Sequence, residues 1–138
     1  MTNRRDILSG MLALVASGAS WPENVWTLND GKTTREPFGD LTVLFDGSTA
    51  QLKSLVAGSL LLKPGMEPHP PHQHPEEEFM LITEGRGEIL VGGKTHQVGP
   101  GALMYSESNQ FHGVKNTGSA PLRFYYFKWL AAQPGSRS

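Results

Sequence analysis

The sequence of 138 residues contains no cysteine. This absence excludes disulfide bonds, thiolate metal ligands, a cysteine nucleophile and lipid attachment to cysteine. An excess of charge of one sign is also missing, because 12 basic residues face 13 acidic ones and the formal net charge is -1. No basic stripe runs along the chain, so we expect no nucleic-acid partner.

A helical repeat sustained over several turns is absent beyond the first twenty residues. Instead, short apolar runs alternate with turn residues at 41–47, 52–65, 77–87, 88–101, 102–118 and 121–130. The pair Gly92-Gly93 lies between two such runs and predicts a two-residue hairpin turn. The chain is too short for two domains. We therefore predict one all-β domain, an antiparallel barrel or sandwich of six to eight strands.

The first residues have the order of an export signal. A basic start at Arg4 and Arg5 precedes an apolar run over 7–19 that ends on small residues. The run is too short to span a bilayer, and the arginine pair resembles a twin-arginine signal. We predict that residues 1–19 direct the protein to the periplasm or out of the cell, with no stable membrane anchor after cleavage. The alternatives are an amphipathic N-terminal helix or a start codon placed too early, either of them on a cytoplasmic protein.

Composition divides the remainder into three parts. Residues 20–40 are polar and weakly patterned and predict an arm lying against the domain, residues 41–130 predict the barrel, and residues 131–138 predict a flexible tail. Trp26 of the arm is expected to pack on the core, with a subunit contact as the alternative. The run Phe124–Phe127 and Trp129 alternate across a strand, so one side faces the interior or a partner.

The segment from 69 to 78 concentrates three histidines and three glutamates. On a strand, His72 and His74 would share a face, and Glu78 has the same parity. Their imidazoles and carboxylate could then converge on one cation. Glu76 and Glu77 are expected to be solvated loop charges. An H-x-H pair near a glutamate also recurs by chance, so this segment alone is a modest signal.

A second segment strengthens the signal. His112 lies eleven residues after Gly101 and four before Asn116. With these residues the chain resembles the cupins, whose two motifs read G-x5-H-x-H-x3/4-E-x6-G and H-x3-N. The matching positions of the first motif are Gly65, His72, His74, Glu78 and Gly85. The gap from Gly65 to His72 is one residue longer than the pattern. Ala102 and the pair Tyr105-Ser106 also depart from the second motif, in what we expect to be loops.

The resemblance implies a jelly-roll barrel, the cupin double-stranded β-helix, with His72, His74, Glu78 and His112 holding one divalent metal ion. Three imidazoles and one carboxylate suit Fe, Mn, Ni, Co, Cu or Zn and suit calcium poorly. About two coordination positions would stay open for a small molecule. His69 precedes Pro70-Pro71, which break the strand geometry that would turn it inward, and His96 has no ligand-spaced partner, so both are expected at the surface.

The resemblance also implies dioxygenase, isomerase or decarboxylase chemistry on a small molecule, and the ligand set favours a dioxygenase. The sequence identifies no catalytic residue beyond the ligands. Met80 and Ile82 either shape the pocket or belong to the core. The alternatives are a non-catalytic module that binds a small molecule or the metal, and a structural barrel without a ligand. A homodimer is expected from the resemblance and because the long aromatic strand is expected at a sheet edge, where it would need covering.

Overall fold

The computed structural model describes residues 24–133, and the predicted export signal at 1–19 lies outside them. Apart from the short 3-10 helix η2 (Leu28–Asp30), the regular elements of the described chain are all strands, joined by loops and turns. These are β1 (Lys32–Glu36), β2 (Gly39–Gly47), β3 (Leu52–Leu62), β4 (Glu77–Glu84), β5 (Gly87–Val91), β6 (Lys94–Val98), β7 (Leu103–Ser106), β8 (His112–Asn116) and β9 (Leu122–Ala131). No helix among residues 24–133 has the length and apolar character needed to cross a membrane.

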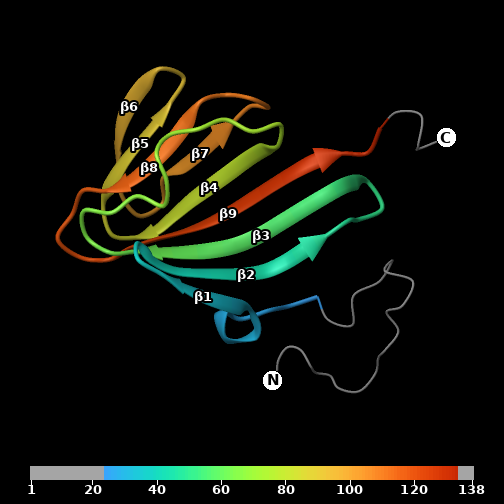
Figure 1. Cartoon of the computed structure of the whole chain (residues 1–138), viewed down its shortest axis with the longest axis horizontal. Helices are drawn as coiled ribbons and strands as arrows, with labels where there is room; N and C mark the ends of the chain where they lie inside the picture. Colours follow the sequence, from blue (N-terminus) through green and yellow to red (C-terminus); the bar gives the residue numbers. More distant parts are fainter. Residues whose placement is uncertain (1–23, 134–138) are drawn as a thin grey trace.

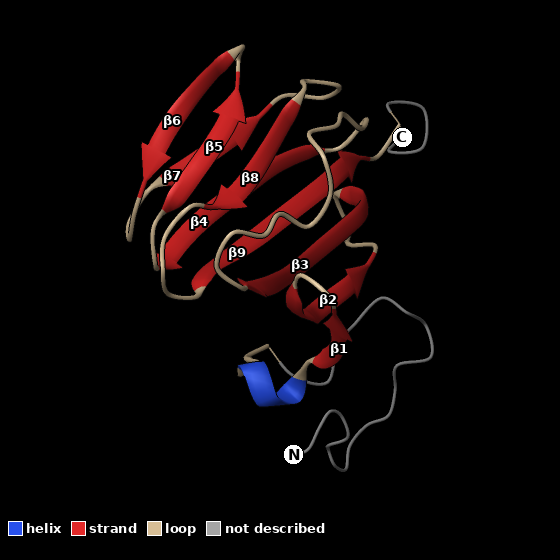
Figure 2. Ribbon diagram, turned by 60° about the vertical axis from the view of Figure 1, so that its left-hand side comes forward, coloured by secondary structure: helices blue, strands red, loops and turns tan. Residues whose placement is uncertain are grey.

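The strands form two sheets in which every pairing is antiparallel. The larger sheet has the order β1-β2-β3-β9-β4-β7, and the smaller one has the order β6-β5-β8. Figures 1 and 2 show the smaller sheet lying over the β4 and β7 end of the larger sheet. The expectation of an antiparallel all-β barrel is confirmed, but the described residues form nine strands and not the expected six to eight.

The core lies between the sheets because alternate residues of each strand turn inward. Strand β9 shows this alternation most clearly, since Leu122, Phe124 and Tyr126 are buried while Arg123 and Tyr125 between them are partly exposed. The parity of the aromatic run, left open by the sequence, is thereby resolved. The buried apolar core comprises Leu60, Leu62, Met80, Ile82, Ile89, Met104, Val114, Leu122, Phe124 and Tyr126.

Two glycines make the predicted hairpin between β5 and β6. Gly92 and Gly93 have φ angles of 64° and 75°, the left-handed values that a two-residue turn of this kind requires at both positions. Val91 and Lys94 pair directly across this turn. The turn prediction is confirmed.

Three details differ from the sequence-based expectations. Residues 32–36 of the expected arm form β1, which pairs along its length with β2 and makes one edge of the sheet, and β2 itself begins within that arm at Gly39. Strand β9 continues to Ala131, the first residue of the expected tail. The aromatic strand β9 is not an edge, because it lies between β3 and β4. Trp26 packs on the domain as expected, with its ring edge against Phe45 at a centroid distance of 6.0 Å.

Candidate metal centre

Two of the predicted ligands come from different sheets. Glu78 lies near the start of β4 in the larger sheet, and His112 opens β8 in the smaller one. Both side chains turn into the interior, with residue exposures of 6% and 2%. Stacking of the two sheets therefore positions this carboxylate and this imidazole face to face.

The other two histidines lie on irregular chain and not on a strand, contrary to expectation. His72 makes only an isolated antiparallel bridge to His112, with backbone N···O distances of 2.9 Å in both directions, and residues 73–76 form no strand. Pro70, Pro71 and Pro75 explain this difference, because proline has no N–H to donate to a sheet. The bridge still holds His72 beside His112, and a bond from Asn109 N to His74 O at 2.7 Å fixes the loop near His74.

The structure brings all four predicted ligand side chains together. Glu78 Oε1 lies 3.0 Å from His74 Nε2 and 3.1 Å from His112 Nε2. Ligand nitrogens of His72, His74 and His112 all lie within 4.8 Å of one another. Adjacent donors on an octahedral ion at about 2.1 Å each would be separated by about 3.0 Å. The Glu78 oxygen thus already has this spacing from His74 and His112, whereas the three histidine nitrogens are known to lie within 4.8 Å of one another.

Backbone carbonyls orient two of the rings. His112 Nδ1 lies 2.8 Å from Gln110 O, and His74 Nδ1 lies 3.1 Å from Glu76 O. A carbonyl only accepts hydrogen bonds, so Nδ1 carries the proton in each ring, and Nε2 faces Glu78, to which it donates when protonated. Without that proton, the Nε2 lone pair points into the cluster. Metal-binding histidines commonly have this arrangement.

The electrostatics of the cluster favour neutral His72 and ionised Glu78. Burial, followed by the nearby His69, His112 and His74, lowers the pKa of His72 to about 4. Burial raises the pKa of Glu78, but the hydrogen bond from His112 and the positive charges of His112, His74 and Lys128 outweigh it and lower the pKa overall. Burial lowers the pKa of His112, yet its bonds to Glu78 and Gln110 raise it above the usual value. A cation entering the cluster would compete with a proton on His112.

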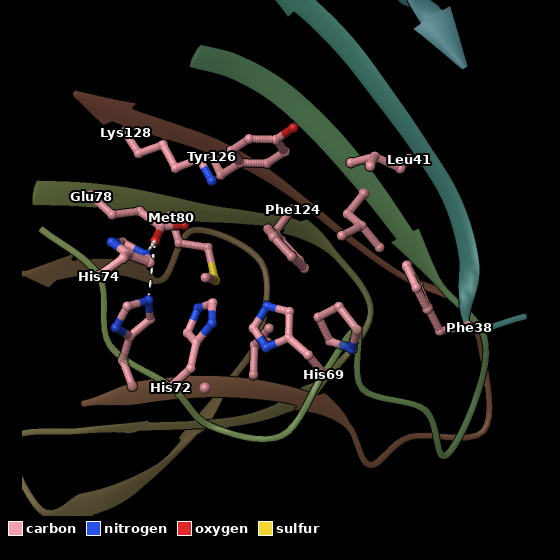
Figure 3. Close-up of a pocket in the computed structure, with 15 residues that line it drawn as sticks. Phe38, Leu41, His69, His72, His74, Glu78, Met80, Phe124, Tyr126 and Lys128 are labelled. Atoms are coloured by element: carbon pink, nitrogen blue, oxygen red, sulfur yellow. Dashed lines mark hydrogen bonds and ion pairs between the residues drawn. The ribbon is translucent and has the colours of Figure 1, made fainter. Parts of the chain in front are cut away.

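A cavity of about 200 Å³ opens beside the cluster. Figure 3 shows His69 and His72 on one side of it and Met80, Tyr126 and Lys128 on the other, with His74 next to Glu78. Its deeper walls are apolar and include Leu41, Leu60 and Phe124. The volume is below the range of roughly 300–1,000 Å³ that is usual for drug-sized ligands. The cavity thus suits a small molecule that reaches the histidines and Glu78.

The predictions that other histidines and glutamates lie exposed at the surface are confirmed for some of these residues and wrong for others. His69 and His96 are exposed, as expected, although the His69 ring lies over His72 at a centroid distance of 3.9 Å and lines the cavity. Glu77 is not a solvated loop charge. It begins β4 and accepts hydrogen bonds from Trp129 Nε1 at 3.1 Å and from the Tyr105 hydroxyl.

Sequence reasoning missed two residues of the site. Ser106 is fully buried, with Oγ 3.1 Å from His112 Nδ1. We had expected Tyr105 and Ser106 to lie in a loop, but they end strand β7. Lys128 lines the cavity from β9. Its parity with Phe124 and Tyr126 was the available signal, but the sequence did not show which side of β9 faces inward.

Comparison with known proteins places this geometry in context. The family model described as "Cupin domain" matches residues 58–128, which include all four candidate ligands. The dimethylsulfoniopropionate lyase DddW of Ruegeria pomeroyi is 32% identical over 83 residues, covering 60% of this chain and 53% of that protein. The chain thus spans about half the length of this curated relative.

Solved structures with the same fold are more distant in sequence. A predicted oxalate decarboxylase from Thermotoga maritima superposes with a TM-score of 0.64 at 21% identity, covering 78% of this chain and 99% of that one. An RmlC-like cupin from Shewanella frigidimarina gives 0.65 at 16% identity, covering 83% and 96%. KdgF from Halomonas sp. gives 0.63 at 16% identity, covering 83% and 98%. These likenesses support the barrel architecture and, at such identities, nothing finer.

Proposed function

The chain belongs to the cupin domain family, and we propose that it is a metal-dependent enzyme acting on a small organic molecule. In this proposal, His72, His74, Glu78 and His112 hold one divalent transition metal ion. The observation that carries it is the position of Glu78 Oε1, 3.0 and 3.1 Å from two imidazole nitrogens that backbone carbonyls orient. Three nitrogen donors and one oxygen donor suit Fe, Mn, Ni, Co, Cu or Zn.

The residues around the cluster have separate tasks. Gln110 O and Ser106 keep the His112 ring in place, and Glu76 O does the same for His74. Leu60 and Phe124 give the cavity an apolar wall that excludes water from the substrate. A bound ion of this type supplies Lewis acidity to a coordinated oxygen.

Among the candidate chemistries, non-oxidative cleavage has the better support. The relative that is 32% identical is a lyase. A dioxygenase, the expectation from sequence, is supported by the ligand set alone. We therefore place lyase chemistry first and dioxygenase or isomerase chemistry second.

A non-catalytic binding module is the alternative function, and one observation favours it. Besides the four ligands, the titratable side chains lining the cavity are His69, Tyr126 and Lys128 among the described residues. His69 is exposed, and burial raises the pKa of Tyr126 to about 12, so its phenol stays protonated at neutral pH. The cavity thus offers no buried general base apart from the ligands.

Metal analysis with a matched pair of histidine variants tests the metal site. Wild type, His112→Ala and His96→Ala are purified identically, and bound metals are counted by mass spectrometry. The wild type and His96→Ala should hold about one ion per chain, whereas His112→Ala should hold almost none. Equal metal content in all three proteins would contradict the site.

Turnover separates the enzyme from the binding module. Consumption of dimethylsulfoniopropionate and of a panel of small organic acids is followed by proton NMR, with an oxygen electrode in parallel. Cleavage without oxygen uptake supports a lyase, and stoichiometric oxygen uptake supports a dioxygenase. Metal-loaded protein that binds members of the panel and turns over none is the binding module.

We further propose that the protein is a homodimer that pairs through the outer face of its larger sheet. Phe79, Leu103 and Tyr105 on this face are 37%, 61% and 44% exposed. The Phe79 ring packs on Tyr105 and on Trp129 at centroid distances of 5.4 and 5.6 Å. Contiguous exposed apolar surface of this kind is typical of subunit contacts.

Export through residues 1–19 also remains a proposal, which N-terminal sequencing of the protein from its native compartment would test.

A further inference from the structure

Lys128 occupies an unusual place for a lysine, on the inner face of the barrel. It pairs directly with Glu78 on one side and with Val56 on the other, so its side chain shares the inward face with Glu78. It is partly buried and lines the cavity. Figure 3 shows its side chain running from β9 toward the cavity beside Glu78 and Tyr126. Most of the other lysines of the described chain are exposed.

This ammonium group has no carboxylate partner within residues 24–133. No ion pair within 4.0 Å joins it to Glu78 or to any other described acid. Glu78 Oε1 instead contacts His74 and His112. Lys128 is nevertheless near enough to help lower the pKa of Glu78 and to oppose the rise in the pKa of His112. It therefore acts on the cluster through space and keeps its own hydrogen-bond donors available to a ligand.

The charges of the site do not balance once a metal ion is bound, and this step rests on the proposed function. A divalent cation and the Lys128 ammonium, set against the single Glu78 carboxylate, leave two positive charges, because neutral imidazoles contribute none. Next to Leu60, Phe124 and Val114 there is little protein polarity to compensate them. Like charges placed close together in such surroundings repel strongly. A ligand carrying one negative charge would halve the imbalance.

We propose that Lys128 is the residue that selects the substrate, by binding the carboxylate of a small organic anion whose other end or second oxygen reaches the metal. An ammonium makes strong, charge-assisted hydrogen bonds to a carboxylate and discriminates against a neutral molecule of the same shape. The presence of Lys128 in the cavity thus implies that the substrate is a small molecule bearing a carboxylate. The four metal ligands alone do not specify this class. The small volume of the cavity limits the length of the chain attached to this group.

The test compares an anion with its neutral isostere. Binding of propanoate and of propanamide is measured by isothermal titration calorimetry on metal-treated wild type, Lys128→Met, Lys128→Arg and Lys94→Met. Methionine keeps the length and the apolar stem of lysine and removes the charge. Lys94 is exposed on β6 and supplies the matched control. Metal content and the unfolding temperature are measured on every sample.

Lys128→Met should weaken propanoate binding at least about tenfold, which corresponds to about 1.4 kcal/mol, and change propanamide binding less than about twofold. Lys128→Arg should keep most of the preference for the anion, and Lys94→Met all of it. Equal weakening of both ligands, no weakening, or no propanoate binding by the wild type would overturn the proposal. Metal content reports separately on the proposed function. A wild type that prefers propanoate through Lys128 but holds no metal would refute the metal site and leave the anion site standing.

Discussion

Replacing Asn116 should destabilise the protein severely, although the residue contacts none of the candidate ligand side chains. Asn116 is fully buried at the end of β8. Its Nδ2 donates to Leu62 O at 3.0 Å and to Ala120 O at 2.9 Å, while its Oδ1 accepts from Gly118 N at 2.9 Å. One side chain therefore ties the end of β3 to the turn between β8 and β9.

The magnitude follows from these three bonds. Each contributes about 1 kcal/mol net, so Asn116→Ala should lower the free energy of unfolding by about 3 kcal/mol before any cost of the cavity. For a domain of this size, the loss corresponds to a fall in Tm of about 12 °C. Asn116→Asp has almost the same shape but sets an acceptor oxygen against two carbonyl oxygens. It should be at least as destabilising at pH 7 and less so in acid, where a protonated carboxyl can donate again.

Thermal and urea unfolding, followed by circular dichroism, measure both variants. Thr117→Ala, at the exposed neighbouring position, is the control and should change stability by less than about 0.5 kcal/mol. Asn116→Asp that is as stable as wild type at pH 7 would refute the reasoning, because the two donor bonds would then contribute nothing.

Three further outcomes follow from the structure. Gly58→Ala should cost about 2 kcal/mol in urea unfolding, because an added Cβ would lie 2.5 Å from Thr42 O and 2.6 Å from the Tyr126 hydroxyl oxygen; wild-type stability would contradict this packing. In NMR titrations of metal-free protein, His72 should stay neutral down to a pKa of about 4. The unfolded chain takes up this proton near pH 6.5, so the contribution of His72 to stability should be full above that pH and fall between about 6.5 and 4; a His72 that titrates near 6.5 would disprove the shift. Leu103→Lys should convert the proposed dimer to a monomer in light scattering after gel filtration, and a monomeric wild type would rule out the dimer.

Much of the fold was predictable because its signals are local. Alternating apolar residues predicted the strands, and Gly92-Gly93 predicted the turn that the structure contains. The spacing of the histidines also indicated which side chains would meet. That prediction succeeded for His72 and His74 although the strand assumed for them is absent, since the bridge to His112 holds the loop in place.

The features that escaped prediction depend on contacts between distant strands. The inward side of β9 is decided by its register with β3 and β4, and that register shifts at irregularities near Leu52 and Ile82. Without it, Lys128 and Trp129 were equally good candidates for the cavity. The central position of β9 likewise depends on sheet order, which no local pattern encodes. Ser106 belongs to the site only because β7 pairs with β4 beside Glu78.

Because Glu78 and His112 belong to opposite sheets, the distance between their donor atoms depends on the relative position of the two sheets. A small slide or splay of one half would separate an oxygen from a nitrogen without disturbing either side chain locally. Substitutions in the middle of the barrel, far from any donor, would therefore change the affinity of the proposed site for a metal ion. A search for variants with altered affinity for the metal ion should therefore include residues packed between the two sheets as well as the candidate ligands.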